Sequence, residues 1–326
     1  MNARRALVIG SKGQDGSYLT ELLDEKGYHV TGVDSSGAVS PASQGCIATV
    51  DMRHESEVLD LIAGIRPDEI YYLAAYHHSS EAGGSDPHEL LQASFDINTL
   101  ALNHVLQAGR KGASGCRIFY AASSRIFGSP ETSVQNENSR FNPECAYGIS
   151  KAAGVLICRY YRKEYGVRCS TGILYNHESP RRRAGFISKN IVSAAVAIKQ
   201  GRRSDLVVGN LDARVDWGFA PDYVSAMWSI LQLDLADDFV IASGSVHSVR
   251  DFVRIAFDAL GLEWSRFVRE DPQVLAGGRP SGVLQGDARK LECATGWRPR
   301  VSFEEMVRIM VEAEIACTQV AAALKN

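Results

Sequence analysis

The sequence predicts an α/β protein: a doubly wound parallel sheet with helices on both faces, followed by a smaller C-terminal lobe. Three observations carry this prediction. Short apolar runs alternate with stretches of helical periodicity, a glycine-rich turn directly follows the first run, and the alternation becomes looser after about residue 175. Apolar runs separated by helices are typical of βαβ units, and 326 residues with 45% hydrophobic content are enough for a large core.

Each expected element follows from its local pattern. Strands are expected at the apolar runs 6–9, 29–33, 69–73, 117–121 and 169–174. Helices are expected at 17–25, 55–65, 87–108, 146–164, 186–200, 220–233 and 247–260. A last helix is expected near Ser302, because Ser302 and Glu305 form a capping-box pattern. We expect residues 1–175 to form the first domain and residues 176–326 a lobe that packs on it.

Charge, hydropathy and cysteine usage exclude several classes of protein. Thirty-five basic and 38 acidic side chains give a net charge of −3, which offers no basic field for a nucleic acid. No stretch approaches the roughly 18 apolar residues of a membrane-spanning helix, and the apolar run before Gly10 is too short for a signal peptide. The seven cysteines are widely spaced, so we expect neither a metal site nor disulfides, and a reducing cytoplasm fits best.

The segment between the first strand and the first helix has a Gly-x-x-Gly-x-x-Gly pattern at Gly10, Gly13 and Gly16, with Gln14 and Asp15 inside it. A dinucleotide pyrophosphate binds at a helix N-terminus, where free N–H groups and the helix dipole favour negative charge. Glycine is needed because a side chain would block its approach. An ordinary glycine-rich turn is the alternative, but the strand–turn–helix context favours a Rossmann-type cofactor site.

Asp34 ends the second expected strand, where a carboxylate can accept hydrogen bonds from the adenosine ribose. It would repel a 2′-phosphate, and no arginine follows within ten residues, so NAD is favoured over NADP. Asp51 and Met52 are candidates to flank the adenine, with a helix cap as the alternative for Asp51. Further candidate cofactor residues, at the ends of expected strands, are Leu73, Ala74, Ala75 and Leu174.

Tyr147 and Lys151 form a Tyr-x-x-x-Lys pattern on an expected helix, so both side chains share one face. An ammonium near a phenol lowers the pKa of the tyrosine, which makes it a usable general base for a carbinol proton. Ser123 follows the strand 117–121, where its hydroxyl can bind the same carbinol. Two exposed helix residues are the alternative for the Tyr–Lys pair alone, but the serine, the pair and the glycine motif in this order are specific.

This combination resembles the short-chain dehydrogenase/reductase superfamily in its extended, nucleotide-sugar branch. The resemblance to the GDP-mannose 4,6-dehydratase family runs from about residue 5 to residue 314. It rests on the segments GQDGSYL (13–19), NHESPRR (176–182), GNLDA (209–213), DWG (216–218), DYV (222–224) and VHSVR (246–250).

The resemblance implies a reaction cycle on a bound nicotinamide cofactor. Tyr147 takes the proton of a sugar 4-hydroxyl while hydride passes to the nicotinamide; water is then eliminated across C5 and C6, and the hydride returns to C6. Ser123 and Lys151 match the family's hydroxyl and lysine positions, and Asn176 and His177 its contacts with substrate and nicotinamide. Kinship also implies a homodimer that pairs through the helices near 87–110 and 146–165.

The sequence departs from the family at several positions. Arg125 stands where the family has the glutamate of the elimination step, and an arginine cannot act as a base. We expect it either to bind an anionic or carbonyl oxygen of the ligand or to form a structural ion pair. Asn190 replaces a lysine, Val215 replaces an arginine of the diphosphate site, and a shortened segment at Arg279 lacks a glutamate.

These departures define the candidate substrate residues and leave three functions open. The candidates are His78, Ser124, Asn176, Asn190, Arg214 and Arg279, with Lys189 as a further possible phosphate contact. Either His77 or His78 is expected to touch substrate, unless both are ordinary loop residues. The first function is a dehydratase-like enzyme that oxidises C4 of a nucleotide-linked sugar; the others are a 4-keto reductase or epimerase on a different activated sugar, and a non-catalytic NAD-binding protein.

Overall fold

The computed structural model describes residues 3–41, 48–77, 86–112, 115–274 and 282–323. The strands are β1 Arg5–Ile9, β2 His29–Val33, β3 Ala38–Pro41, β4 Ala48–Thr49, β5 Glu69–Tyr72, β6 Arg117–Ser123, β7 Val134–Gln135, β8 Cys169–Leu174, β9 Asn176–Glu178, β10 Leu206–Val208, β11 Arg214–Phe219, β12 Asp238–Ile241, β13 Val246–Ser248, β14 Val268–Glu270 and β15 Gln285–Gly286. The α-helices are α1 Gln14–Glu25, α2 Glu55–Ile65, α3 Pro87–Phe95, α4 Ala101–Lys111, α5 Ala146–Tyr165, α6 Ile187–Lys199, α7 Ala220–Gln232, α8 Val249–Asp258, α9 Arg289–Thr295 and α10 Phe303–Ala323. Shorter helical turns are η1 Asp96–Leu100, η2 Ser124–Phe127, η3 Trp264–Arg266 and η4 Pro272–Val274.

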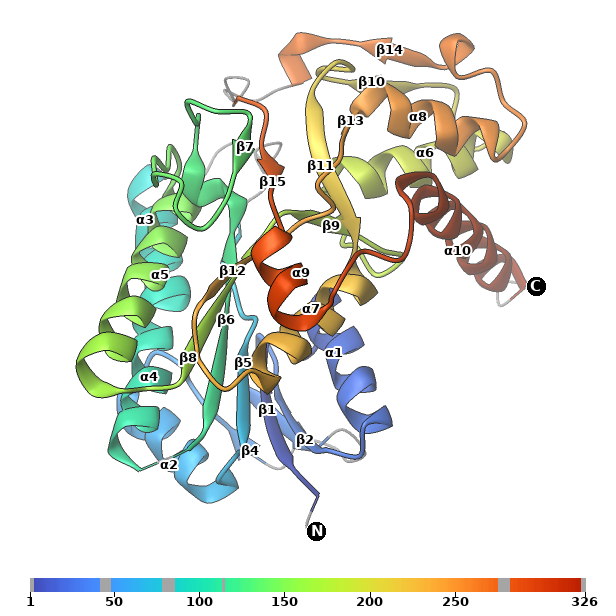
Figure 1. The fold of residues 1–326 in the computed structure, drawn as a ribbon. Coiled ribbons are helices and arrows are strands. Elements are labelled where there is room, and N and C mark those ends of the chain that lie inside the picture. The colour runs from blue at the N-terminus through green and yellow to red at the C-terminus, as the bar shows by residue number, and fades with distance from the viewer. Residues whose placement is uncertain (1–2, 42–47, 78–85, 113–114, 275–281, 324–326) are drawn as a thin grey trace.

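One eight-stranded sheet dominates the fold, in the order β12-β8-β6-β5-β1-β2-β3-β4 (Figure 1). The pairs from β12 to β2 are parallel, which confirms the predicted fold class. The edge differs from the prediction: β3 and β4 are antiparallel and lie in a polar stretch without a predicted strand, where Val39 is buried in the core. The strand order reverses between β1 and β5, and such a switch point opens a crevice at the carboxyl ends of the strands.

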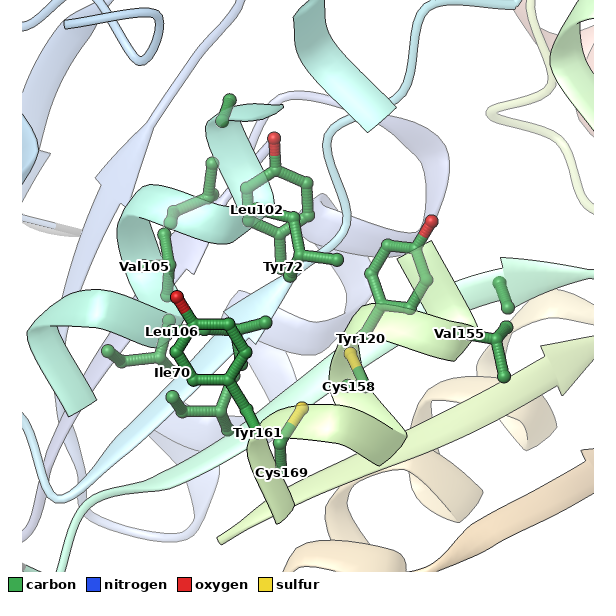
Figure 2. Packing of buried hydrophobic residues seen from close by; sticks show 14 of the residues in the cluster. Ile70, Tyr72, Leu102, Val105, Leu106, Tyr120, Val155, Cys158, Tyr161 and Cys169 are labelled. Carbon is green, nitrogen blue, oxygen red and sulfur yellow. The ribbon is translucent and has the colours of Figure 1, made fainter. Parts of the chain in front are cut away.

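Helices cover both faces of this sheet. On one face, α2, α4 and α5 bury a cluster in which Leu102 and Val155 lie close to Tyr120 of the sheet (Figure 2). On the other face, α1 and α7 bury Leu23 and Met227. Burial on both sides explains why the central strands are continuous apolar runs in the sequence.

The long helix expected at 87–108 is present as α3 and α4, joined by the π-helical turn η1. This turn buries Asn98, whose Nδ2 donates to Ser150 Oγ at 3.0 Å. Asn98 Oδ1 also accepts the Tyr76 N–H at 2.9 Å, and Asn98 Nδ2 donates to Tyr76 O at 3.2 Å. One buried amide therefore connects α5 with the loop that follows β5.

The smaller lobe has its own core, formed by α6, α8 and α10 with β11 (Figure 1). Its sheets are β13-β11-β9 and β10-β14. At the start of α10, the Glu305 N–H donates to Ser302 Oγ at 3.2 Å, which is one half of the expected capping box. β12 and α7 come from the later half of the chain yet lie on the large sheet, so the division at residue 175 stays a proposal about domains.

Candidate active site

The glycine-rich turn lies between β1 and α1, at the switch point of the sheet. Gly10 has a φ of +94°, and a Cβ there would lie 2.8 Å from Ala74 N, directly beyond β5. A Cβ on Gly16 would lie 2.1 Å from Gly10 O. Gly13 is the N-cap residue of α1, and Asp15 lies in the first turn of that helix. The backbone therefore requires glycine at two positions, and the turn leads into the N-terminus of α1, the kind of position at which phosphate groups bind.

Asp34 lies directly after β2 and is already engaged by two neighbours. Its Oδ1 accepts the Ser36 N–H at 2.8 Å and the Ser36 hydroxyl at 2.5 Å, and its Oδ2 pairs with Lys12 of the glycine-rich turn. Hydrogen bonds from Lys12 and Ser36 hold the pKa of Asp34 below its ordinary value. The carboxylate is therefore ionised where the sequence predicts a ribose contact, but the Lys12 charge beside it was not part of that prediction.

Asp51 and Met52 follow β4 and face different surroundings. The Arg53 guanidinium, whose Nε lies 2.9 Å from Asp51 Oδ1, lowers the pKa of Asp51. Met52 is buried in the core, and His104 Nδ1 donates to its carbonyl oxygen at 3.0 Å. The N-cap residue of α2 is His54, so Asp51 does not cap this helix. Contact with an adenine stays a prediction for both residues.

Ser123, Tyr147 and Lys151 meet where β6 ends beside the first turns of α5. Lys151 Nζ donates to Ala121 O at 2.7 Å and lies 5.8 Å from the centre of the Tyr147 ring. Burial raises the pKa of Tyr147 to about 12, against a hydrogen bond with Ser123 that lowers it. Burial also lowers the pKa of Lys151 to about 7. The expected lowering of the tyrosine pKa is therefore wrong, because removal from water outweighs the hydrogen bond with Ser123 and the charge of Arg182.

His177, in β9, forms a buried ion pair with Asp15 of α1. His177 Nε2 lies 2.9 Å from Asp15 Oδ2, and its Nδ1 donates to Tyr175 O at 2.7 Å. Burial lowers the pKa of His177, but the Asp15 carboxylate outweighs burial and raises it. Burial likewise raises the pKa of Asp15, and His177 outweighs this and lowers it. Since both ring nitrogens face acceptors, the imidazolium form fits this position.

A second set of contacts ties the same turn to the smaller lobe. Gln14 Nε2 donates to His177 O at 3.1 Å, and Ser179 Oγ donates to Gln14 Oε1 at 2.9 Å. Leu174, at the end of β8, is buried against the face of the sheet that α1 and α7 cover. The start of α1 is thus held against the segment that enters the smaller lobe.

Three further side chains form a row that starts at the Tyr147 ring, in the order His77, Phe186 and Arg182. The His77 ring meets the Tyr147 ring edge-on, with 4.8 Å between ring centres, and stacks on Phe186 at 5.3 Å. The Arg182 guanidinium lies 4.4 Å from the centre of the Phe186 ring, and its Nε is 2.7 Å from Glu178 Oε2. The sequence analysis expects His77 or His78 to touch substrate, and Arg182 stands in the NHESPRR segment, but no sequence signal indicates Phe186.

The remaining predicted residues near Ser123 lie in η2. Ser124 is buried, and Arg125 is exposed, with its backbone N–H donating to Ser123 Oγ at 3.2 Å. Arg125 therefore lies in the turn directly after Ser123, the residue whose hydroxyl the sequence predicts to bind the carbinol. His78 and Arg279 lie outside the described residues.

The substrate residues predicted in the smaller lobe are spread over three elements. Asn176 is exposed in β9, and Arg214 is exposed at the start of β11. Asn190 Oδ1, in α6, accepts the Gly185 N–H at 3.3 Å. Lys189 Nζ lies 2.6 Å from Glu314 Oε2 and fixes α6 to α10, which argues against the role of phosphate contact considered for it.

Metal ligands and membrane spans were also sought in the described ranges. Within them, no group of three or more His, Cys, Asp or Glu side chains is arranged to hold a metal ion. No helix in these parts of the chain is long and apolar enough to cross a membrane. The six cysteines that the structure describes are free thiols.

The doubly wound sheet, the glycine-rich turn at its switch point and the Ser–Tyr–Lys group at the same edge define an extended short-chain dehydrogenase/reductase. A family model described as GDP-mannose 4,6 dehydratase matches residues 7–310. GDP-mannose 4,6 dehydratase 2 of Arabidopsis thaliana is 36% identical over 330 residues, which cover 95% of this chain and 86% of that protein. The chain belongs to the GDP-mannose 4,6-dehydratase family, as its sequence motifs indicated.

Solved structures support the fold. RMD from Pseudomonas aeruginosa complexed with NADPH has a TM-score of 0.81 at 22% identity, covering 96% of this chain and 100% of that one. Thermus thermophilus UDP-glucose 4-epimerase in complex with NAD has a TM-score of 0.76 at 23% identity, covering 95% and 98%. These likenesses confirm the Rossmann-type architecture with its smaller lobe.

Proposed function

We propose that this enzyme is a dehydratase of a nucleotide-linked hexose, with GDP-mannose as the first candidate because its relatives carry that name. The observation that carries the proposal is the position of Tyr147, with Ser123 and Lys151, at the same edge of the sheet as the glycine-rich turn. A proton acceptor and a dinucleotide site at one edge are what oxidation of a carbinol requires.

A dinucleotide fits the residues at this edge. Gly10 and Gly16 have no room for a Cβ because the turn packs closely on neighbouring backbone, and the turn leads into the N-terminus of α1, where a pyrophosphate would bind. Asp34 would hold the adenosine ribose, and Tyr147 and Lys151 would hold the nicotinamide ribose. When bound, the nicotinamide supplies a hydride acceptor for C4 of the sugar and later a hydride donor for C6.

The protein's own part in the oxidation is to hold the sugar and move one proton. Ser123 would bind the 4-hydroxyl oxygen, and Tyr147 would take its proton. Because burial raises the pKa of Tyr147 to about 12, the phenol needs nearby positive charge to act near neutral pH. Lys151 provides this charge when protonated, and its pKa of about 7 makes the protonated fraction sensitive to pH in that range.

We propose NAD as the cofactor in preference to NADP. An ionised Asp34 beside the adenosine ribose repels a 2′-phosphate. Lys12 neutralises part of that charge, so the preference depends on the Lys12–Asp34 pair and not on Asp34 alone.

Arg125 favours a second candidate function, a 4-keto reductase or epimerase on a different activated sugar. The family resemblance puts the elimination base at this position, and a guanidinium cannot take a proton from carbon. A reaction without elimination would need only Ser123, Tyr147 and Lys151.

One incubation separates the two candidates. The purified protein is mixed with NAD and GDP-mannose, and the products are followed by NMR. A 4-keto-6-deoxy sugar supports the dehydratase, a 4-keto or epimerised sugar that keeps its 6-hydroxyl supports the second candidate, and no reaction with GDP-mannose or other nucleotide sugars contradicts both. Arg125→Glu should increase 6-deoxy product if Arg125 limits elimination, whereas Arg266→Glu, exposed in the smaller lobe, should not.

We also propose that the enzyme is a cytoplasmic homodimer. The free cysteines fit a reducing compartment. The helices expected to pair two subunits carry exposed apolar side chains, namely Leu91, Leu100, Ile149, Leu156 and Tyr160. A dimer would cover them, and light scattering on the wild-type protein and on Leu156→Asp tests this, with dissociation expected only for the variant.

A further inference from the structure

We propose that Tyr120 is a positioning residue of this site, whose ring face holds the ammonium group of Lys151 in place and favours its charged form. Tyr120 lies in β6 and Lys151 in α5. The inference rests on the proposed function and deepens it, because Tyr147 needs a nearby positive charge to take a proton near neutral pH. Tyr120 acts through Lys151 and does not itself contact the sugar in this proposal.

Lys151 is a deeply buried cation with few partners. Its exposed fraction is 1%, and its Nζ donates to Ala121 O at 2.7 Å. No carboxylate among the described residues forms an ion pair with it. Burial of a charged group with so few partners is unfavourable, and it lowers the pKa of Lys151 to about 7. Any further attraction for the ammonium therefore decides how much of Lys151 is charged near neutral pH.

The ring of Tyr120 supplies such an attraction. Lys151 Nζ lies over this ring at 4.9 Å from its centre, closer than the 5.8 Å to the centre of the Tyr147 ring. An ammonium within about 6 Å of an aromatic ring centre is attracted by the negative face of the ring, most strongly where both are removed from water. Tyr120 is fully buried, so this contact is of the stronger kind.

Two features of the fold fix the ring in front of the lysine. The Tyr120 hydroxyl donates to Asn98 O, in η1, at 3.1 Å. Gly154 lies three residues beyond Lys151 on the same face of α5, and a Cβ there would overlap that hydroxyl. Glycine within a helix costs stability relative to alanine, so the helix loses stability at the one place where the ring needs room.

A neutral ring suits the proposed reaction better than a carboxylate would. A carboxylate would also hold the ammonium, but it would cancel the positive charge at Tyr147. The other titratable groups that face Tyr120 or Lys151 are Cys158 of α5, Tyr72 of β5 and Cys169 of β8. Burial raises the pKa values of Cys158 and Tyr72, so both are neutral near neutral pH. The charge of Lys151 therefore remains available to Tyr147.

The test follows the titration of Lys151 itself, which needs no substrate. Protein with lysine isotope-labelled at Cε is titrated by NMR, with and without NAD, and the signal is assigned with Lys151→Met. Tyr120→Phe keeps the ring face and should titrate like the wild type. Phenylalanine fluorinated at both meta positions has a weakened ring face. At position 120 it should lower the titration midpoint of Lys151 by about 0.4 pH units or more, the scale of one cation–ring contact.

The pH dependence of turnover provides a second measurement. Charged Lys151 is required for proton transfer to Tyr147, so activity is lost as pH rises through the pKa of Lys151. The fluorinated ring at position 120 should therefore move this loss of activity to lower pH by the same amount as the NMR midpoint. A fall in activity that is equal at every pH would indicate a packing defect and would overturn the role of the ring face.

Tyr72 offers a matched control. It is also fully buried, its hydroxyl donates to Ile97 O of the same turn η1 at 2.5 Å, and the cation–ring contacts described for Lys151 are with Tyr120 and Tyr147. The fluorinated ring at position 72 should leave the midpoint of Lys151 unchanged. An unchanged midpoint with the fluorinated ring at position 120, or an equal change from position 72, would overturn the inference.

The two measurements keep this inference separate from the proposed function. A lysine midpoint that responds to the ring at position 120, in a protein that converts no nucleotide sugar, would contradict the proposed function and leave the contact with Lys151 standing. A midpoint that does not respond, in an enzyme that forms the 6-deoxy sugar, would overturn the role of Tyr120 alone.

Discussion

The cofactor side and the substrate side of this site are fixed in different ways. On the cofactor side, the backbone itself dictates the residues: a Cβ on Gly10 or Gly16 would lie within 2.8 Å or 2.1 Å of neighbouring backbone atoms. On the side where we propose that substrate binds, His77 comes from the segment after β5, whereas Phe186 and Arg182 come from the segment before α6, and the three meet through ring contacts. Backbone constraints leave a local pattern in the sequence, whereas contacts between distant side chains leave none.

Tyr147 is proposed to contact both the nicotinamide ribose and the sugar, so its substitution is expected to have the largest effect on turnover. Tyr147→Phe removes one hydroxyl from a ring that keeps its contacts, so turnover should fall by at least about 100-fold while NAD binding is retained. Steady-state rates and a cofactor titration measure the two effects. Tyr160→Phe, half exposed on the same helix, is the control. Full turnover in Tyr147→Phe would show that Tyr147 is not the base, whereas a wild-type protein that binds NAD without any turnover would be a non-catalytic NAD-binding protein.

The backbone constraint on the cofactor side is tested at Gly16. Gly16→Ala forces a Cβ onto Gly10 O, so we expect a loss of about 1–3 kcal/mol in the free energy of unfolding and loss of NAD binding. Gly64→Ala, in α2 with open space around it, should instead gain up to about 1 kcal/mol because alanine favours a helix. Denaturant unfolding measures both, and equal stabilities would contradict the packing argument.

These differences explain how much of the molecule could be predicted. The parallel sheet and most of its helices follow from period and local signals, since strands buried on both faces are apolar runs. The π-helical turn η1 could not be predicted, because it depends on Asn98 reaching Ser150 and Tyr76 across the fold. The antiparallel strand β3, next to the edge strand β4, was missed because its four residues include a serine and a proline.

The candidate site divides in the same way. Local patterns in the sequence identify the glycine triplet, Ser123, Tyr147 and Lys151. They do not reveal the electrostatics of these residues, because the pKa of Tyr147 is set by burial, which spacing along a helix cannot show. The Lys12–Asp34 and Asp15–His177 pairs join residues that are far apart in the chain. A single sequence carries no signal that such distant residues form a pair.

The Lys12–Asp34 pair shows that the cofactor side also depends on a contact between side chains, and not on backbone constraints alone. Asp34→Asn removes the carboxylate and leaves Lys12 beside the adenosine ribose. We expect NAD affinity to fall by about 10-fold, the scale of one lost charge-assisted hydrogen bond, and NADP affinity to rise. Titration of both cofactors measures this, with Asp60→Asn, exposed on α2, as the control. An unchanged ratio of the two affinities would contradict the selectivity assigned to Asp34.

The Asp15–His177 pair lies where the two sides meet, and its effect on stability is expected to depend on pH. The pKa of His177 is raised above its ordinary 6.5, so its stabilisation is complete below that value and is lost as pH rises through the raised pKa. The pKa of Asp15 is lowered below its ordinary 3.8, so its contribution is present above 3.8 and is lost as pH falls. Asp15→Asn should therefore destabilise the protein most near about pH 5, by about 1–3 kcal/mol, and less near about pH 9.

Glu57→Gln, which breaks the exposed pair with His54, is the control and should change stability little at either pH. Because the glycine-rich turn is held to the smaller lobe through this pair, a pH-independent loss in Asp15→Asn would mean that hydrogen bonding, and not charge, joins the cofactor side to the substrate side.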